Sequence, residues 1–278
     1  MNGYGTVDDI FVGLRLRFRF PRVCSRHGSA ASVALPNGTR VDQRRVRQRT
    51  ATAPKYNIVV LHPERHTNNH VFREQVIETV DAPVHHLLTV DGHPPTSAQM
   101  KDENDRHQQL LNNASRRQAL QKQQNSDDKK MEELLRIIPE AFVFEDQGKE
   151  GQSERVAFRP SPEFNPKTYE QRILHALHGT VFIDLRDKRI ARLSGSLGTR
   201  VVFGHGVIGY VEQGGITDIT RVQLSPGVWK TSVEKIAIDG RFVLLKTINK
   251  HQDESRTDFE SVAPDTTFAQ ALSKIKTK

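Results

Sequence analysis

The chain has 278 residues, of which 36% are hydrophobic and 27% are charged. This balance is typical of a soluble, partly helical protein with enough residues to form a real core. No apolar run reaches the roughly 18 residues that a membrane-spanning helix needs, so none is predicted. The single cysteine, Cys24, excludes an intramolecular disulfide and a cysteine-based zinc site.

The net charge of +8 is concentrated at the N-terminus. Residues 1–50 hold ten arginines, no lysine and three aspartates, which gives +7, so residues 51–278 carry the remaining +1. Asp8 and Asp9 stand where a secretory signal would be basic, so no signal peptide is predicted. We interpret residues 1–50 as a basic, disordered segment, or as translation from a start codon set too early. The alternative is an arm that binds nucleic acid or another polyanion.

Short extended segments are predicted over residues 56–90. Apolar and β-branched residues alternate there, imperfectly over residues 71–80, where a helix is the alternative. The Asp91-Gly92 pair then predicts a tight turn.

Three histidines, His62, His66 and His70, are spaced so that they would line one face of a helix. Such a face can hold a metal ion. Pro63 argues against that helix. We therefore expect exposed loop histidines and no metal site.

A polar insertion follows over residues 97–138. A strongly polar helix is predicted for residues 97–125, and Ser126 is expected to cap a second helix that ends at Pro139. The first should mostly face water, and the second, with a narrow apolar stripe of Met131, Leu134, Leu135 and Ile138, should dock on the sheet. The alternative is a structural module that recruits a partner protein, although heptads are not sustained.

Two strands, residues 141–145 and 154–159, are predicted next, joined by a glycine-bearing loop. The Asn165-Pro166 pair predicts the start of a helix that runs to His178 and ends at Gly179.

Residues 180–248 are typical of one antiparallel meander, because apolar runs alternate with turn residues. Glycines within residues 201–211 predict bulges or sharp curvature. The Asp239-Gly240 pair predicts a two-residue hairpin, and a change of phase predicts a bulge near Glu234. Several runs are apolar on both faces, so both faces of the sheet should be covered.

A final helix is predicted from a capping box formed by Thr267 and Gln270. Its apolar residues are Phe268, Leu272 and Ile275. The sequence thus predicts an α+β fold in which residues 51–278 form one domain. That domain would be a curved antiparallel β-sheet, an incomplete barrel, with helices packed across its concave face.

No motif predicts catalysis. Gly204, Gly206 and Gly209 are spaced as in a phosphate loop, but β-forming residues follow where a helix is needed. No carboxylate pair is fixed at a separation suited to acid–base work, and no GxSxG elbow occurs. We therefore predict a non-enzymatic protein without cofactor or metal.

Between about residues 141 and 259, the order of strands and turns resembles the lipoprotein-carrier superfamily, which includes outer-membrane lipoprotein-sorting proteins of Gram-negative bacteria, and also a bacterial family of uncharacterised proteins. The matching stretches are GTVFIDLRDKRIARLSGSL, VVFGHGVIGYVEQGGITDI, SPGVWKTSVEKIAIDGRFVLLKT and SRTDFE. The resemblance implies a half-barrel around an apolar cavity that accepts acyl chains. It also implies a place in the periplasm or cell envelope, with the cytoplasm as the alternative.

The predicted function is binding of a lipid or another hydrophobic ligand, with at most transient membrane association. Nucleic acid is not an expected partner of the domain. Candidate cavity residues follow from the expected faces of the strands, with plain core positions as the alternative for each. They are Phe182, Val202, Tyr210, Trp229, Phe242 and Leu244.

Overall fold

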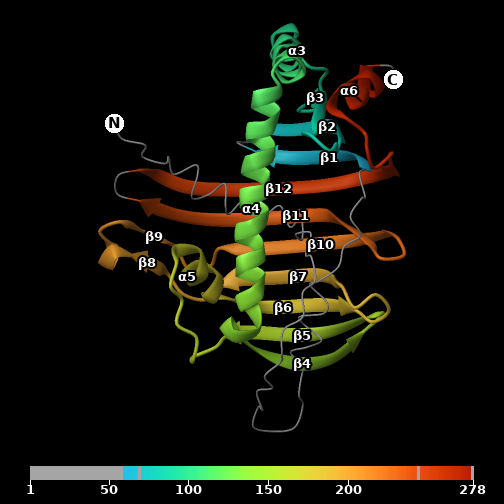
Figure 1. Ribbon diagram of the computed structural model, residues 1–278. Helices are drawn as coiled ribbons and strands as arrows, with labels where there is room; N and C mark the ends of the chain where they lie inside the picture. The colour runs from blue at the N-terminus through green and yellow to red at the C-terminus, as the bar shows by residue number, and fades with distance from the viewer. Residues whose placement is uncertain (1–58, 68–69, 243–244, 277–278) are drawn as a thin grey trace.

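The computed structural model describes residues 59–67, 70–242 and 245–276 (Figure 1). The basic segment of residues 1–50, with Cys24, lies outside the described residues, so its role stays a prediction. The described chain forms one mostly antiparallel sheet with helices, which confirms the predicted α+β class.

Twelve strands form this sheet, which is not closed into a barrel. In chain order they are β1 (Val59–Thr67), β2 (His70–Ile77), β3 (Val84–Val90), β4 (Phe142–Glu150), β5 (Ser153–Pro160), β6 (Leu177–Asp184), β7 (Ile190–Leu197), β8 (Val201–Phe203), β9 (Gly209–Val211), β10 (Ile216–Ser225), β11 (Val228–Phe242) and β12 (Leu245–Ser261). They pair in the order β3-β2-β1-β12-β11-β10-β7-β6-β5-β4, and β9 joins β8 to β11. The strands predicted within residues 56–90 and 141–159 are therefore confirmed.

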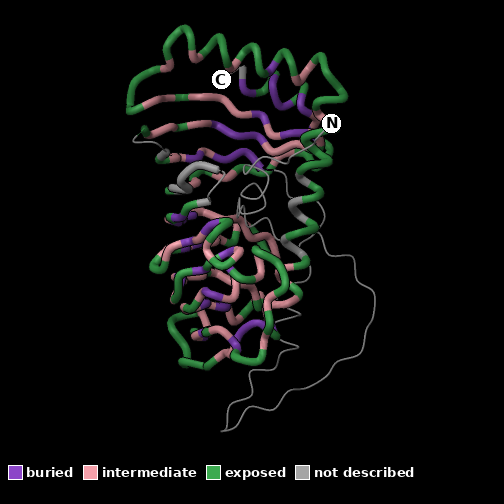
Figure 2. Tube along the Cα trace, turned by 90° about the vertical axis from the view of Figure 1, so that its left-hand side faces the viewer, coloured by how far each residue is buried: buried purple, intermediate pink, exposed green. Residues whose placement is uncertain are grey.

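Five helical segments are described, and one of them crosses the sheet. They are α3 (Ser97–Asn112), α4 (Ala114–Ala141), α5 (Tyr169–His175), the 3-10 turn η1 (Gly204–Gly206) and α6 (Phe268–Lys276). Figure 1 shows α4 running across the strands from the β1–β3 end to the β4–β6 end. In Figure 2, α4 stands to one side of the sheet and most of its described residues are exposed. The finer expectation, that helices pack across a concave face, stays a prediction.

The polar insertion divides at a different point from the one predicted. Asn113 ends α3 and caps α4, because its side-chain oxygen accepts the Arg116 N–H at 2.9 Å. Helix α4 then continues through Ser126 to Ala141, so the expected cap at Ser126 is wrong. An asparagine side chain competes well for a free backbone N–H, and here that local bond decides where the helix begins.

Helix α3 lies against the edge strand β3. The Glu103 carboxylate accepts the Leu87 N–H at 2.8 Å and lies 2.7 Å from Nδ1 of His86. His107 is buried, and its Nε2 lies 2.9 Å from the His85 carbonyl oxygen. These contacts cover part of an edge that would otherwise be open to strand pairing.

Helix α5 is shorter than predicted. Thr168, rather than Asn165, accepts the N–H that caps it, and the helix ends at His175. Gly179 therefore lies within β6 instead of ending a helix. A side chain at Gly179 would collide with the backbone of Ser194 on β7, so this glycine permits close strand approach.

The Asp239-Gly240 pair does not form a hairpin. Both residues lie inside β11, where they pair with Asn249 and Ile248 of β12. A Cβ atom at Gly240 would lie 2.5 Å from the Tyr210 carbonyl oxygen. The glycine thus serves the close approach of β9, and β11 continues to Phe242.

Residues 201–211 are two short strands, β8 and β9, joined by η1, rather than one curved strand. Gly204 and Gly206 adopt positive φ angles of 55° and 88°, which glycine tolerates. The bulge expected near Glu234 is confirmed, because the β10–β11 register shifts between Val233 and Thr231.

Three apolar clusters fix the helices to the sheet. The end of α4 packs on β4–β6, and α5 packs on β7–β9 and β11. Helices α3 and α6 pack on β1–β3. The predicted capping box of α6 is confirmed, because Thr267 Oγ1 accepts the Gln270 N–H at 3.3 Å and Gln270 Oε1 accepts the Thr267 N–H at 2.9 Å.

Candidate functional site

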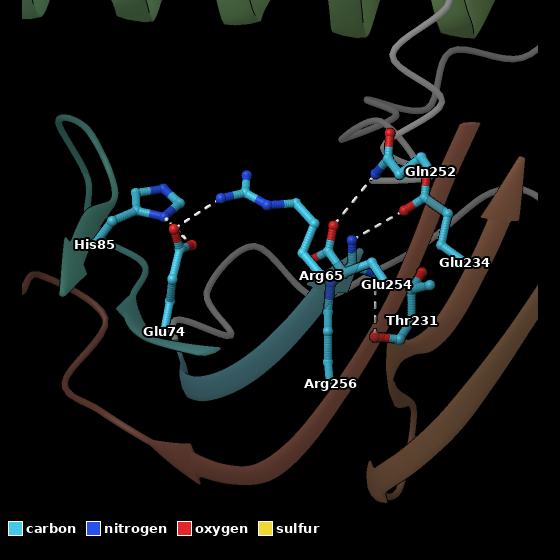
Figure 3. Close-up of polar contacts among 8 residues, drawn as sticks. All are labelled: Arg65, Glu74, His85, Thr231, Glu234, Gln252, Glu254 and Arg256. Atoms are coloured by element: carbon cyan, nitrogen blue, oxygen red, sulfur yellow. Dashed lines mark hydrogen bonds and ion pairs between the residues drawn. The ribbon is translucent and has the colours of Figure 1, made fainter. Parts of the chain in front are cut away.

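A buried ionic cluster lies on the two longest strands, and Figure 3 shows it in detail. Glu234 on β11 and Glu254 on β12 are directly opposite each other in the register. Arg256 donates from Nη2 to Glu234 at 2.9 Å and from Nε to Glu254 at 2.8 Å. The Glu234 side chain is only 2% exposed and that of Arg256 is 12% exposed. The cluster is therefore a set of charges held largely away from water.

The arrangement follows from strand geometry. Two carboxylates in opposite positions repel each other, so they need a cation between them. Arg256 lies two residues after Glu254 and so shares its face of the strand. The bulge in β11 adds the Thr231 carbonyl oxygen as a further acceptor for Arg256, at 3.5 Å. Gln252, on the same face, donates to Glu254 at 3.2 Å.

The charge of Arg256 is maintained by these neighbours. Burial alone would lower the pKa of the guanidinium, but the charges of Glu254 and Glu234 and their hydrogen bonds outweigh it and raise the pKa. A buried charge persists only when it is paired and hydrogen-bonded in this way.

A second ionic group lies beside the first. Arg65 on β1 is opposite Glu254 of β12, and its Nη2 donates to Glu74 of β2 at 2.8 Å. His85 of β3 lies 3.2 Å from the same carboxylate. Burial raises the pKa of Glu74, but the hydrogen bond and charge of His85, followed by the charge of Arg65, outweigh it, so the pKa is lowered. Polar side chains therefore continue from β11 across β12 and β1 to β3.

The strand register places the first cluster on the α4 side of the sheet. Glu234 is opposite Ile219, Ile219 is opposite Leu193, and Leu193 is opposite Val181. Directly opposite residues share a face. Val181 belongs to the apolar cluster against which Ile138 of α4 packs. The α4 side thus carries apolar residues from β4 to β10, and a charged cluster on β11, β12 and β1 that is flanked by apolar residues of the same strands, among them Ile236 and Leu61.

The structure brings only two of the predicted cavity residues together. Val202 and Tyr210 are opposite each other on β8 and β9. Val202 is 48% exposed, and the Arg200 guanidinium lies 3.5 Å from the centre of the Tyr210 ring. Phe242 ends β11, with its side chain outside what the structure describes, and Leu244 lies outside the described residues.

Phe182 and Trp229 have other surroundings. Phe182 lies between Val181 and Ile183, which face the α4 side, so alternation turns its ring to the other side, 5.7 Å from the Arg192 guanidinium. Trp229 donates from Nε1 to Asp187 at 2.8 Å. Cavity lining by the six residues stays a prediction.

Asp187 organises the turn beneath Trp229. The same carboxylate oxygen also accepts from Gln223 Nε2 at 2.6 Å and from the Gly227 N–H at 3.1 Å. The Trp229 hydrogen bond lowers the pKa of Asp187 against the opposing effect of burial, and the Gly227 N–H adds to the lowering. The carboxylate therefore joins the β6–β7 turn to the β10–β11 hairpin.

We expect Asp187→Asn to lower the free energy of unfolding by about 1 kcal/mol at neutral pH, because three hydrogen bonds lose their charged acceptor. The contribution of a depressed carboxyl pKa is complete above the unfolded value of about 3.9 and is lost as pH falls through the lower folded pKa. Wild type and variant should therefore converge in urea unfolding midpoints below that pH. A constant difference down to the acid limit would contradict the role of the Asp187 charge.

The ionic clusters were not predicted, although one signal was present. The phase shift near Glu234 places this charged residue in line with the apolar residues Ile236 and Ile238 of the same strand. Gln252, Glu254 and Arg256 also alternate along β12. What the sequence lacks is the register of β11 with β12, which alone shows that Glu234 and Glu254 are opposed.

No metal centre is found among the described residues, where no group of three or more potential ligands gathers. His62 and His66 lie on β1 and His70 begins β2. The three histidines therefore do not share a helix face, and the expectation that they lie in a loop is wrong. Of the helices within the described ranges, none is long and apolar enough to cross a membrane.

Comparison with known proteins gives no relative. No family model, curated protein or solved structure matches the chain. The resemblance to the lipoprotein-carrier superfamily therefore stays a prediction.

Proposed function

We propose that this chain is a non-enzymatic binding protein that takes up a lipid or another amphipathic, hydrophobic molecule on the α4 side of its open sheet. The resemblance to envelope lipoprotein carriers supports the same class of ligand and suggests the bacterial cell envelope as the setting.

The observation that carries the proposal is that apolar side chains and a charged cluster lie on the same side of the sheet. Val181, Leu193 and Ile219 place hydrocarbon side chains on β6, β7 and β10, and Val181 and Ile219 are buried there. Arg256 and Arg65 lie further along the same side. Removal of apolar area from water would drive binding of an acyl chain, at about 25 cal/mol per Å². The charged cluster would lie beside the polar headgroup of the ligand.

Binding fits the ionic cluster better than catalysis does. Arg256 is hydrogen-bonded to both Glu234 and Glu254. Catalytic acids and bases need pKa values close to the working pH. The two carboxylates instead stabilise the charged state of the arginine, which suits a fixed electrostatic feature. Helix α4 crosses above these strands (Figure 1), so ligand entry would require it to move.

The test uses a fluorescent fatty acid titrated into the full chain, together with native mass spectrometry of the freshly purified protein. We expect saturable binding with a dissociation constant that is roughly micromolar. Leu193→Ala should weaken it by up to about fiftyfold, because the three carbon atoms removed contribute about 0.8 kcal/mol each when buried.

Phe182→Ala is the matched control. It removes a larger apolar side chain from the neighbouring strand, on the opposite side of the sheet, and should leave probe affinity unchanged. Equal losses in the two variants would contradict binding on the α4 side. Absence of both saturable probe binding and co-purifying lipid would overturn the proposed function.

A further inference from the structure

A pocket of about 420 Å³ lies between α6 and the strands β1, β2 and β12. Its apolar wall is made by Val60, Ile77 and Val262. Gln75 contributes a polar group, and Glu260 and Lys274 contribute opposite charges. Sites for small molecules typically have volumes of about 300–1,000 Å³ and combine an apolar wall with a few polar groups.

The pocket is separate from the α4 side of the sheet. Val60 is opposite Ile77 on β2 and opposite Glu260 on β12, so the three residues share one face. Leu61, the next residue of β1, points to the other face and packs with Val76. The pocket therefore belongs to the face that α6 covers, and an inference about it is independent of the proposed function.

Gln75 is the unusual residue in this wall. It is 7% exposed and lies on the same face as Ile77, two residues further along β2. No hydrogen bond links its amide to any described residue. The amide is not enclosed by protein, so its donor and acceptor atoms are available to a molecule in the pocket.

Helix α6 contacts the sheet with one face and borders the pocket with the next. The helix packs on the sheet through Phe268, Ala271, Leu272 and Ile275. Ser273 and Lys274 lie on the next part of its surface and line the pocket. The same two residues also line an adjoining pocket of about 210 Å³, so the hollow continues along the side of the helix.

We propose that this pocket binds a small zwitterion with an apolar side chain, of the chemical class of free aliphatic or aromatic α-amino acids. The side chain covers Val60, Ile77 and Val262. The carboxylate pairs with Lys274, the ammonium group pairs with Glu260, and the Gln75 amide bonds one of the two charged groups. A simple carboxylic acid or amine would match only one of the two charges at the pocket.

The test is isothermal titration calorimetry of the full chain with L-leucine and L-phenylalanine. Isocaproate and isoamylamine, which each lack one charged group of leucine, serve as comparison ligands. We expect saturable binding of an amino acid, with a dissociation constant of roughly 1 mM or tighter. Each comparison ligand should bind at least about tenfold more weakly, because it loses a charge-assisted hydrogen bond.

Two variants locate the site. Gln75→Leu replaces a buried amide by an apolar side chain of similar size, which should leave folding intact, and Lys274→Gln removes the ammonium group. Both should weaken amino-acid binding at least about tenfold and leave fatty-acid binding unchanged. Lys101→Gln, at an exposed position of α3, is the matched control and should bind as wild type does.

Three results would overturn the proposal. One is the absence of saturable heat with either amino acid. The second is wild-type affinity in both Gln75→Leu and Lys274→Gln. The third is equal affinity for leucine and for isocaproate or isoamylamine, which would show that the pocket does not bind the carboxylate and the ammonium group of one ligand at the same time.

Discussion

Replacement of Arg256 by methionine is expected to lower the free energy of unfolding by about 3–5 kcal/mol. The substitution leaves Glu234, which is 2% exposed, opposite Glu254 with no cation between the two carboxylates. Methionine retains much of the volume and the apolar stem of arginine, so the loss measures charge rather than packing. The measurement is the urea unfolding midpoint, with the slope checked for two-state behaviour.

The size of the effect should depend on pH. In the Arg256→Met variant, burial and the charge of Glu254 both raise the pKa of Glu234. A carboxyl group whose folded pKa is raised costs stability above its unfolded pKa of about 4.3, and the cost disappears as protonation becomes complete in both states. The difference from wild type should therefore shrink as pH is lowered from 7 toward 4.

Arg192→Met provides the comparison for an exposed ion pair. Arg192 donates to Asp218 at 3.2 Å, and its side chain is 49% exposed. Exposed pairs contribute about 0–1 kcal/mol, so this variant should stay near wild type. The double variant Arg256→Met with Glu234→Gln should recover part of the stability lost by Arg256→Met alone. An Arg256→Met variant as stable as Arg192→Met would contradict the account of the buried cluster.

The features predicted correctly from the sequence depend on contacts close along the chain. The capping box of Thr267 and Gln270 spans three residues, and the bulge near Glu234 shows as a change of phase within one strand. The strands of residues 56–90 likewise follow from local alternation. Such patterns predict the structure correctly because the residues that form them are neighbours in both the chain and the fold.

Two of the wrong predictions, the hairpin at Asp239-Gly240 and the helix end at Gly179, involve partners that are distant in the chain. Gly240 reads as a turn residue, but it lies within a strand because β9 approaches it closely. Gly179 likewise resembles the glycine that ends a helix. In the structure it lies within β6, where its lack of a side chain allows β6 to approach β7. A glycine that turns the chain and one that admits a neighbouring backbone look alike in sequence.

The candidate site shows the same limit. Alternation correctly separates Phe182 from Val181 and Ile183, but it cannot say which face α4 crosses. The pairing of Glu234 with Glu254 depends on the register of β11 and β12. Charged residues in strands are usually assigned to water. The ionic cluster could therefore be recognised only once the strands were paired.

Phe203→Ala is expected to lower the free energy of unfolding by about 3–5 kcal/mol, because it empties the centre of a packed cluster. Phe203 is completely buried on β8, and its ring centre lies 4.9 Å from that of Tyr169 at the start of α5. The same cluster contains Ile173 of α5 and Ile236 of β11, so the ring joins the β8–β9 unit to the helix and the main sheet. Urea unfolding measures the loss.

The adjacent residue separates core from ligand contact. Val202 is 48% exposed on the same short strand, so Val202→Ala should change the free energy of unfolding by less than about 0.5 kcal/mol. If Val202 lines a ligand site, the same variant should weaken fatty-acid binding while stability stays constant. If Phe203→Ala were as mild as Val202→Ala, the β8–β9 unit would not be held by this cluster. Stability and probe affinity measured on the same two variants thus distinguish a residue that holds the sheet together from one that contacts a ligand.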